Sequence, residues 1–519
     1  MKKKFIKTIF FIIGFTFILS SCTKKLSKLN EDPNSYQKVN ADFLFTSSIL
    51  DAVGGDRFSW MMRFNLMAAL QQEATYSLLT APGDKYLSEG YGSYLWNSYS
   101  HCVRQIEDVI QNVKDDPDMS NKLAIARIWR VYMFHRLTDI FGDVPYFEAG
   151  KGLEGQYQPK FDKQSDIYPD MLKVLEESAN SLDASKPTFG SSDLLYGGNV
   201  TQWKKFAFSL MLRLGMHLTK VDLASAETWV KKAIAGGPIL EDVDLAKISY
   251  FDGSLASNRN PISAQWLELD YVNPQDPNNV QGCKISKRFI DELKGNSTTT
   301  KDPRLNVISV LWVKQPSGLY VKDTSTALQN GMENAKYSSY PAEYATFSEP
   351  NPSTVMSYSA PICVMTPAEV NFLLAEAAIR GWYSGNVSDA YSNGVKAAMK
   401  QWALYGSEGV ISQDKVDYYL TNNPFKTGGT FEEKLDQIST QKWILFYVDQ
   451  IENFANWRRT NYPVLIPTNY PGNLTGGQIP RRMIVPDTEE LYNKDNFTEA
   501  KNRQSGDNTF LSRVWWDKE

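Results

Sequence analysis

Few side chains of this sequence have types and spacings that could carry out acid–base or metal chemistry. The chain holds three histidines, His101, His135 and His217, each in a segment of helical periodicity and none in a His-Glu-x-x-His arrangement. The clustered Cys and His residues that a zinc site needs do not occur. We therefore expect packed or partly exposed helical histidines and no cofactor, although a calcium ion bound in an oxygen-rich loop stays open.

Motifs for nucleophilic and nucleotide chemistry are missing as well. The sequence contains no Gly-x-Ser-x-Gly elbow and no Walker-type loop. Gly150, Gly152 and Gly155 spell Gly-x-Gly-x-x-Gly, but they follow the end of a helix and precede Gln158-Pro159. A dinucleotide site needs a strand before these glycines and a helix after them, so this stretch is better interpreted as a loop.

Adjacent carboxylates are equally poor candidates for catalysis. Examples are Asp115-Asp116, Glu176-Glu177 and Glu489-Glu490. Neighbouring residues on a helix do not face each other, so none of these pairs makes a good acid–base dyad. Hydrolysis of a glycoside needs two carboxyl groups set across the sugar from distinct elements, and no pattern here indicates that. We expect no catalytic residue.

One cysteine has a clear chemical role. Four lysines lie within the first seven residues, and the apolar run Thr8–Leu19 is shorter than the roughly 20 residues that span a bilayer. A charged start and a short apolar core are typical of a signal peptide, and Leu19-Ser20-Ser21 before Cys22 is similar to a bacterial lipobox. We expect residues 1–21 to be removed and Cys22 to carry the lipid; an ordinary signal peptide with a chance cysteine is the alternative.

The remaining composition excludes some partners. Lys and Arg number 55 against 59 Asp and Glu, for a formal net charge of −4, so no basic surface for nucleic acid is expected. No later stretch is apolar for long enough to cross a membrane. Cys102, Cys283 and Cys363 can form one disulfide with a free thiol, or stay as three buried thiols; the sequence leaves both open.

Helical periodicity dominates two long parts of the chain. Residues 42–238 and 362–460 show apolar residues at offsets of three and four, as in Trp203, Phe206, Leu210 and Leu214. The expected helices include Asn121–Phe141, Pro367–Trp382, Val387–Leu404 and Glu432–Val448. A stripe of small residues, Ala390, Gly394 and Ala397, would let two helices approach closely, as in tetratricopeptide pairs.

The other parts of the chain lose that periodicity. Residues 239–361 and 462–519 are rich in Pro, Asn, Ser and aromatics, and Asn306–Val313 alternates like a short strand. Long irregular segments in a compact protein are usually functional or disordered, and the aromatics argue against disorder. We therefore expect one mature domain, 22–519, made of a helical scaffold and an irregular lobe.

The motifs along the chain resemble the SusD/RagB family of outer-membrane nutrient-binding lipoproteins, in its Asn-x-Asp-Pro-Asn branch. The matching segments are, in order, Leu29-Asn30-Glu31-Asp32-Pro33-Asn34, Leu137-Thr138-Asp139-Ile140-Phe141-Gly142-Asp143-Val144-Pro145-Tyr146, Phe161-Asp162-Lys163-Gln164, Trp203-Lys204-Lys205-Phe206, Gln441-Lys442-Trp443-Ile444, Trp457-Arg458-Arg459-Thr460, Ile479-Pro480-Arg481-Arg482 and Arg513-Val514-Trp515-Trp516-Asp517. Their order over almost the whole chain, behind a lipobox, carries the resemblance.

The resemblance implies a mostly α fold: a right-handed stack of tetratricopeptide-like helix pairs with an irregular, loop-rich lobe carrying short strands. It implies a non-enzymatic lid on a TonB-dependent, SusC-like β-barrel transporter that captures oligosaccharides, or sometimes peptides. A glycan-active hydrolase and a scaffold binding only a protein are the alternatives. It implies the outer membrane and the cell surface, yet Thr23-Lys24-Lys25 stands where acidic residues often follow the acylated cysteine, so the periplasmic face stays open.

Most of these motifs have a structural interpretation. Gly142 and Pro145 end a helix. Arg458 and Arg459 can bind carboxylates or carbonyls of neighbouring loops through guanidinium forks, with a ligand role as the alternative. Trp515 and Trp516 are expected to dock the C-terminal tail onto the scaffold.

Two aromatic-rich loops are the candidates for ligand binding. The candidate residues are Tyr76, Tyr86 and Tyr91 in the first loop, and Asn258, Arg259, Trp266, Tyr271 and Trp312 in the second. Flat rings bury the apolar face of a sugar or a peptide side chain, while Arg and Asn hydrogen-bond hydroxyls or carbonyls. Trp266 is the first choice, because the flanking Glu268 and Asp270 indicate that it stays near the surface.

The lipid site gives a direct prediction. Cys22→Ala should release the protein from membranes or stall its processing, because the acylated residue is lost. Metabolic labelling with a fatty acid and membrane fractionation check this. Label incorporated into the mutant would refute the assignment.

Overall fold

The computed structural model describes residues 39–54, 60–78, 82–87, 92–267, 283–295, 301–504 and 507–519. The signal segment, Cys22, Tyr91 and Tyr271 lie outside these residues. The described part is mostly α-helical, and the strands are few and short. The predicted fold class, a stack of helix pairs with an irregular lobe, is confirmed.

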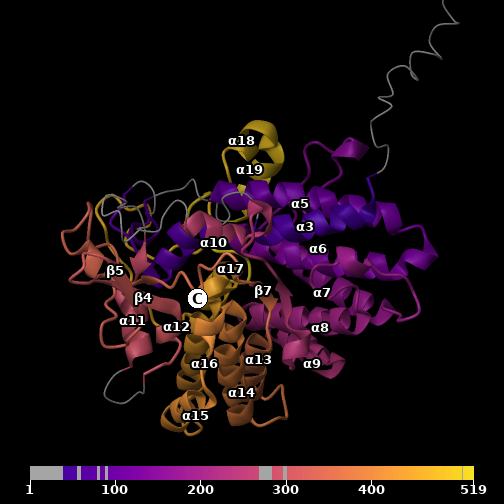
Figure 1. The fold of residues 1–519 in the computed structure, drawn as a ribbon. Helices are drawn as coiled ribbons and strands as arrows, with labels where there is room; N and C mark the ends of the chain where they lie inside the picture. The colour runs from indigo at the N-terminus through magenta and orange to yellow at the C-terminus, as the bar shows by residue number, and fades with distance from the viewer. Residues whose placement is uncertain are drawn as a thin grey trace, which may run out of the picture.

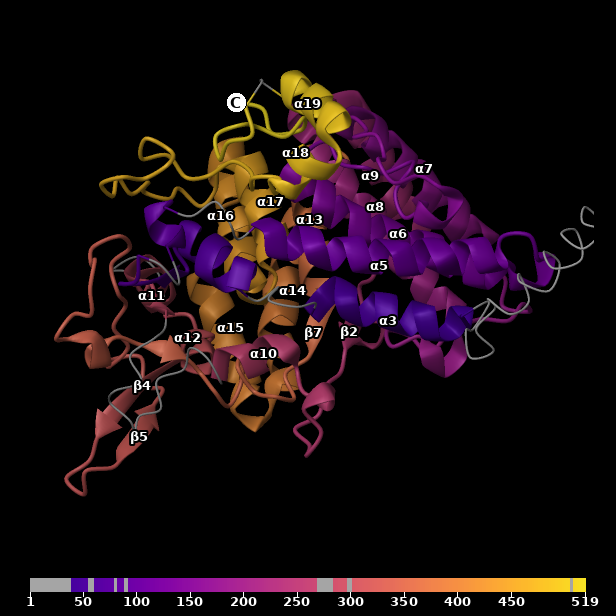
Figure 2. The same ribbon diagram turned by 90° about the horizontal axis from the view of Figure 1, so that it is seen from above.

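The first half of the chain forms a layered stack of antiparallel helices (Figures 1 and 2). These are α3 (Ala41–Gly54), α5 (Gly92–Val113), α6 (Ser120–Phe141), α7 (Gln164–Ser181), α8 (Val200–His217) and α9 (Leu223–Gly236). Each packs on the next in order. The predicted apolar face of α8 is buried: Trp203, Phe206, Leu210 and Leu214 are all 0% exposed. The helix begins where the Asn199 side chain accepts the amide hydrogens of Thr201 and Gln202.

The second half supplies another group of helices, which packs against α8 and α6. These are α13 (Pro367–Ile379), α14 (Val387–Lys400), α15 (Gln413–Asn422), α16 (Phe431–Leu445) and α17 (Gln450–Thr460). The small-residue stripe does bring two helices together, since a Cβ on Gly394 would lie 2.6 Å from the Phe372 ring. The predicted α13 and α14 both end early, and α14 passes into a 3-10 turn, Gln401–Tyr405.

The irregular lobe holds five of the short strands among the described residues. Its elements are a π-helix (η1, Met61–Met67), α10 (Pro261–Gln265), α11 (Lys287–Lys294), α12 (Leu305–Ile308), β1 (Glu73–Ala74), β3 (Lys284–Ile285), β4 (Ser309–Lys314), β5 (Tyr320–Asp323) and β6 (Glu349–Pro350). β1 pairs with β3, and β4 lies between β5 and β6, all antiparallel. The predicted strand Asn306–Val313 is β4, with its first residues in α12. Residues 60–78 belong to this lobe although they lie between α3 and α5 in the sequence.

Two more elements lie at the margins of the stack. β2 (Ala246–Ile248) and β7 (Ile362–Met365) pair where the chain leaves and re-enters the helical layers. The C-terminal part adds α18 (Thr488–Tyr492) and α19 (Lys494–Arg503) above α5 (Figure 1), and the C-terminus lies at one side of the molecule, near α19 (Figure 2). Within the described residues, none of the helices combines the length and apolar character needed to span a bilayer.

Candidate functional site

Two of the predicted ligand residues are buried, which contradicts the expectation that they lie at the surface. Trp266 is 6% exposed and Tyr86 is 2% exposed. Trp266 continues α10 in helical conformation, and its ring lies under the Arg63 guanidinium, 4.5 Å from centroid to Cζ. Arg63 in turn pairs with Glu73 at 2.9 Å. Trp266 is therefore a core residue that covers a buried ion pair.

Tyr86 is held in place by the C-terminal loop. Its backbone lies in the left-handed region at φ +56°, and its carbonyl accepts the amide hydrogen of Leu474 at 2.9 Å. The burial raises the pKa of its hydroxyl. Tyr86 thus anchors one loop on another.

Asn258 and Arg259 occupy a separate surface loop. Asn258 is exposed, and its carbonyl accepts the amide hydrogen of Phe251 at 2.8 Å. Arg259 donates to the carbonyl of Gly253 at 3.2 Å, and its guanidinium lies 4.3 Å from the Tyr358 ring centroid. These contacts shape the loop, and none of them joins it to Trp312.

Tyr76 and Trp312, by contrast, come together with rings that the sequence analysis did not select. The Tyr76 ring lies 5.6 Å from that of Tyr340 and 5.2 Å from that of Tyr344, and the two partner rings are 4.9 Å apart. We call the group the aromatic surface. Its members are Tyr76, Trp312, Tyr320, Tyr340 and Tyr344. Tyr340 is 43% exposed, so the group reaches solvent.

A buried ion pair holds the aromatic surface together. Lys284 on β3 pairs with Glu349 on β6, and both residues are at most 3% exposed. Trp312 Nε1 donates to Glu349 Oε2 at 3.2 Å, while Lys284 Nζ lies 4.3 Å from the Tyr344 ring centroid. A buried charge is tolerated only when it is paired and hydrogen-bonded, so these contacts fix the positions of both rings.

The lobe is tied to the scaffold through Gln72, which precedes β1. The Gln72 side-chain amide donates to the main-chain carbonyl of Trp443 at 2.6 Å. The main-chain carbonyl of Gln72 accepts the amide hydrogen of Ser286 at 3.0 Å. Trp443 Nε1 donates back to the carbonyl of Leu70 at 3.1 Å. The Trp443 motif in α16 therefore positions the strands that carry the aromatic surface.

Chemically, the aromatic surface can stack rings and exchange hydrogen bonds. Burial, with smaller effects of Tyr320 and Glu349, raises the pKa of the Tyr340 hydroxyl. The phenol stays protonated at neutral pH and can donate to a ligand oxygen.

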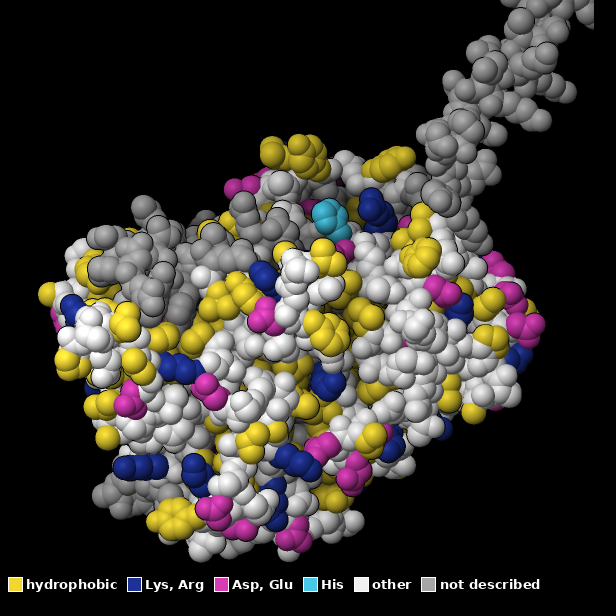
Figure 3. Space-filling model, viewed as in Figure 1, with side chains coloured by type: hydrophobic (Ala, Val, Ile, Leu, Met, Phe, Trp, Pro, Cys, Tyr) yellow, Lys and Arg dark blue, Asp and Glu magenta, His cyan; other side chains and the backbone are white. Residues whose placement is uncertain are grey.

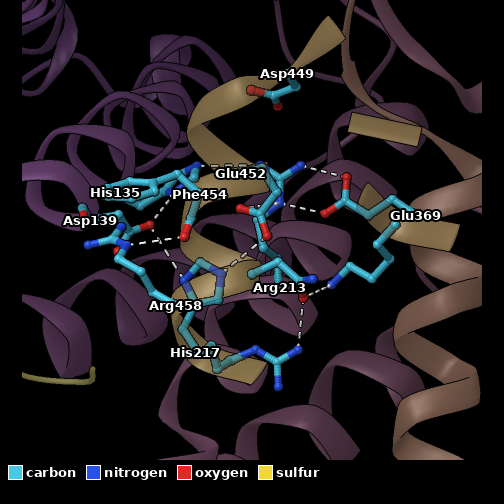
Figure 4. Close-up of polar contacts among 12 residues, drawn as sticks. His135, Asp139, Arg213, His217, Glu369, Asp449, Glu452, Phe454 and Arg458 are labelled. Atoms are coloured by element: carbon cyan, nitrogen blue, oxygen red, sulfur yellow. Dashed lines mark hydrogen bonds and ion pairs between the residues drawn. The ribbon is translucent and has the colours of Figure 1, made fainter. Parts of the chain in front are cut away.

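The most concentrated group of charges lies instead in the centre of the scaffold (Figure 4). Asp139 of α6 accepts from Tyr168 and from Trp516 Nε1, the latter at 2.9 Å, and it lies 3.1 Å from His135 Nδ1. Its carbonyl accepts from Arg458 of α17 at 2.5 Å. Four separate segments thus meet at one residue.

A second set of ion pairs continues this buried group toward α13. Arg213 of α8 binds both oxygens of Glu369 at 2.7 Å, and His217 Nε2 lies 3.3 Å from Glu452 Oε1. Burial alone would lower the pKa of His217, but Glu452 and Asp139 raise it. Burial lowers the pKa of His135 to about 4. His217 is therefore favoured as a cation and His135 as a neutral ring.

This central group has the character of structure rather than of catalysis. Its side chains are at most 2% exposed, so no substrate reaches them. In the part of the chain that the structure describes, no three His, Cys, Asp or Glu side chains are grouped to hold a metal ion. Cys102, Cys283 and Cys363 are free thiols. The Gly150–Gly155 stretch is a loop with one 3-10 turn, as predicted.

The structural interpretation of the sequence motifs is confirmed. Arg459 binds both oxygens of Glu376 at 2.6 Å, and Arg458 also donates to the carbonyl of Arg481 at 2.9 Å. Trp516 is 0% exposed and docks the tail, while α6 ends at Gly142 with φ +83°. The arginines therefore join elements of the scaffold.

The site residues missed from the sequence had a weak signal. Tyr340 and Tyr344 lie four residues apart within the aromatic-rich segment. Lys284 and Glu349 gave no sequence signal, because they pair between strands that are 65 residues apart in the chain.

Comparison with known proteins gives a consistent result. Residues 33–486 match a SusD-like family model described as starch-binding, associating with outer membrane. Among solved structures, a chitin-binding protein is 30% identical (TM-score 0.78) and a Bacteroidetes SusD-like protein, AC2a, is 28% identical (TM-score 0.80). The alignments cover 92% and 93% of this chain and 100% of each of those chains. A chitin-binding SusD homologue from Flavobacterium johnsoniae, 24% identical over 92% of this chain and 99% of its own, shares the fold at a TM-score of 0.73. No curated protein matches.

Because Trp266 is buried, its removal should act on stability. Trp266→Ala should lower the free energy of unfolding by about 3–5 kcal/mol, through the cavity and the uncovered Arg63. Urea unfolding measures this, with Tyr418→Ala, which truncates a ring 63% exposed, as the control. If Trp266→Ala were as stable as wild type but no longer bound ligand, the result would contradict the core assignment and indicate that Trp266 contacts the ligand.

The two buried histidines predict a specific pH dependence. In the folded protein the pKa of His135 is about 4, below its usual value of 6.5. Between pH 4 and pH 6.5 the unfolded chain therefore binds more protons than the folded protein. Stability from His135 is present above pH 6.5 and is lost as pH falls toward 4. The free energy of unfolding of the wild type should fall between about pH 7 and pH 5. In His135→Gln that fall should be smaller by about 2 kcal/mol. His101→Gln, at an exposed position of α5, should leave the loss unchanged; identical pH profiles for His135→Gln and wild type would contradict the assignment.

Proposed function

Since the chain belongs to the SusD-like family, we propose that it is an outer-membrane lipoprotein that binds an oligosaccharide and passes it to a TonB-dependent transporter. In this account Cys22 carries the lipid anchor, and the folded domain acts as a lid on the barrel. It binds and releases its ligand without cleaving it.

The aromatic surface is the observation that supports ligand binding. Tyr76, Trp312, Tyr320 and the exposed Tyr340 gather near one buried ion pair, with the buried Tyr344 beneath them, and Tyr76 and Trp312 belong to the loops predicted from the sequence. Rings fixed by such a pair lose little conformational entropy when a sugar stacks on them. Phenol hydroxyls beside the rings can then orient the sugar through its hydroxyls.

An oligosaccharide is favoured over a peptide. The family description names starch, and the chitin-binding structure that is 30% identical covers almost the whole chain. Both are neutral polymers of pyranose rings. The surface likewise presents rings around a charge that is already neutralised by Lys284, which suits a neutral ligand.

Binding to a transporter requires a large interface between this protein and the barrel. A lid must seal the mouth of a barrel, so the interface should bury at least about 1,200 Å² in total. Mild-detergent extraction should recover the protein with one large barrel protein.

The ligand assignment is tested by calorimetric titration with chito-oligosaccharides, malto-oligosaccharides and oligopeptides. Tyr340→Ala should weaken binding of the true ligand by about tenfold, roughly 1.4 kcal/mol, with little change in thermal stability. Tyr418→Ala, an exposed tyrosine on α15, is the matched control and should bind as wild type does.

Product analysis of the same mixtures separates the alternatives. Heat without products supports a binding protein. Released reducing ends would support a hydrolase. If no ligand gave a binding heat while the protein bound a barrel protein tightly, the result would support a scaffold that binds only a protein. Unchanged affinity in Tyr340→Ala would remove the aromatic surface from the site.

A further inference from the structure

A hollow lies beneath α18, away from the aromatic surface. It is bounded by α5, by the loop that follows α6, and by α18, with a volume of about 220 Å³. We call it the α18 pocket. The aromatic surface belongs to the lobe around β4 and β5, well apart from α18 (Figure 1).

The floor and one wall of the α18 pocket are apolar and fixed. Phe134, Leu137 and Val103 are each at most 6% exposed and form part of the lining. Trp96 forms a wall, and its ring stacks on Phe161 with centroids 5.9 Å apart and an interplanar angle of 15°. The wall cannot turn away without breaking that contact.

The mouth of the pocket is formed by rings that lie open to solvent. Tyr157 is 81% exposed and Tyr492 is 73% exposed, and Leu491 beside them is 75% exposed. In Figure 3, apolar side chains stand out along the top edge, where Figure 1 places α18. Apolar groups gathered around a hollow mark an interaction site more often than scattered ones do.

Hydrogen bonds between the loop at residues 157–159 and the end of α18 fix the rim of the pocket. Gln158 donates to the carbonyl of Tyr492 at 2.9 Å, and Asn493 donates to the carbonyl of Pro159 at 2.8 Å. The rim is therefore formed before any ligand arrives, which lowers the entropy cost of binding.

One charged group faces this apolar space. Among the described residues that line the pocket, Glu489 alone carries a charge, and its Oε1 accepts from Trp96 Nε1 at 3.1 Å. Burial raises the pKa of Glu489. Among the residues that the structure describes, no Lys, Arg or His forms an ion pair with Glu489, so a donor or a positive charge on a ligand would find a poorly hydrated acceptor there.

We propose that the α18 pocket binds a ring-sized apolar group that carries a positive charge or a hydrogen-bond donor, received by Glu489. The size follows from the volume, since an apolar cavity of about 150 Å³ accommodates benzene. This site is independent of the oligosaccharide site proposed above, and it adds a second ligand class to the protein.

Three probes of similar size test the charge preference: phenethylamine, 2-phenylethanol and phenylacetate, titrated into the full folded protein by calorimetry. The amine should bind most tightly and the acid at least about tenfold more weakly, as expected for a charge-assisted hydrogen bond. Glu489→Gln should remove the advantage of the amine and leave the affinity for the alcohol within about twofold.

Two further variants keep the test sharp. Tyr492→Ala should weaken all three probes, whereas Tyr418→Ala should weaken none; both rings are exposed, so neither truncation should unfold the protein. Equal binding of acid and amine, absence of amine binding at millimolar concentration, or wild-type affinity in Tyr492→Ala would overturn the proposal. Tighter binding of octylamine than of phenethylamine would also overturn it and would assign the pocket to a lipid chain.

Discussion

The carboxylate of Asp139 is the point on which the arrangement of the scaffold depends. A buried carboxylate is costly unless several donors satisfy it, and here the donors come from α6, α7 and the C-terminal tail, while Arg458 of α17 binds the carbonyl of the same residue. All four segments must be in place together. Because removal of any one of them leaves a buried charge or donor unpaired, the group joins the two helical halves and the tail into one unit.

That buried centre is connected by polar contacts to the rest of the scaffold and to the irregular lobe. The ion pairs of Arg213 and Arg459 reach α13, and the polar contacts of Trp443 and Gln72 reach the strands of the lobe. The aromatic surface is then set by a second buried pair, Lys284 with Glu349, which lies outside the central group. Residues of the signature motifs thus build the support, and the rings of the aromatic surface come from segments between the motifs.

The sequence predicted the helices well and the members of the aromatic surface only in part. Apolar spacing along α8 determines which face is buried, so that helix follows from local pattern alone. Trp266 was misassigned because its burial depends on Arg63 and Glu73, which pair with each other far from it in the chain. Trp312 and Tyr76 were selected as rings in loops, but their meeting with Tyr340 and Tyr344 is set by strand pairing between distant segments, which single-residue patterns do not encode.

The central claim is that ligand binds the aromatic surface on a scaffold that performs no chemistry. A crystal structure of the protein with the oligosaccharide that binds most tightly tests this most directly. The account predicts an intact oligosaccharide with a pyranose ring stacked on Tyr340 or Trp312 and a hydroxyl within hydrogen-bonding distance of a tyrosine oxygen. An oligosaccharide ordered elsewhere on the protein, with the aromatic surface empty, or a cleaved product in its place, would contradict it.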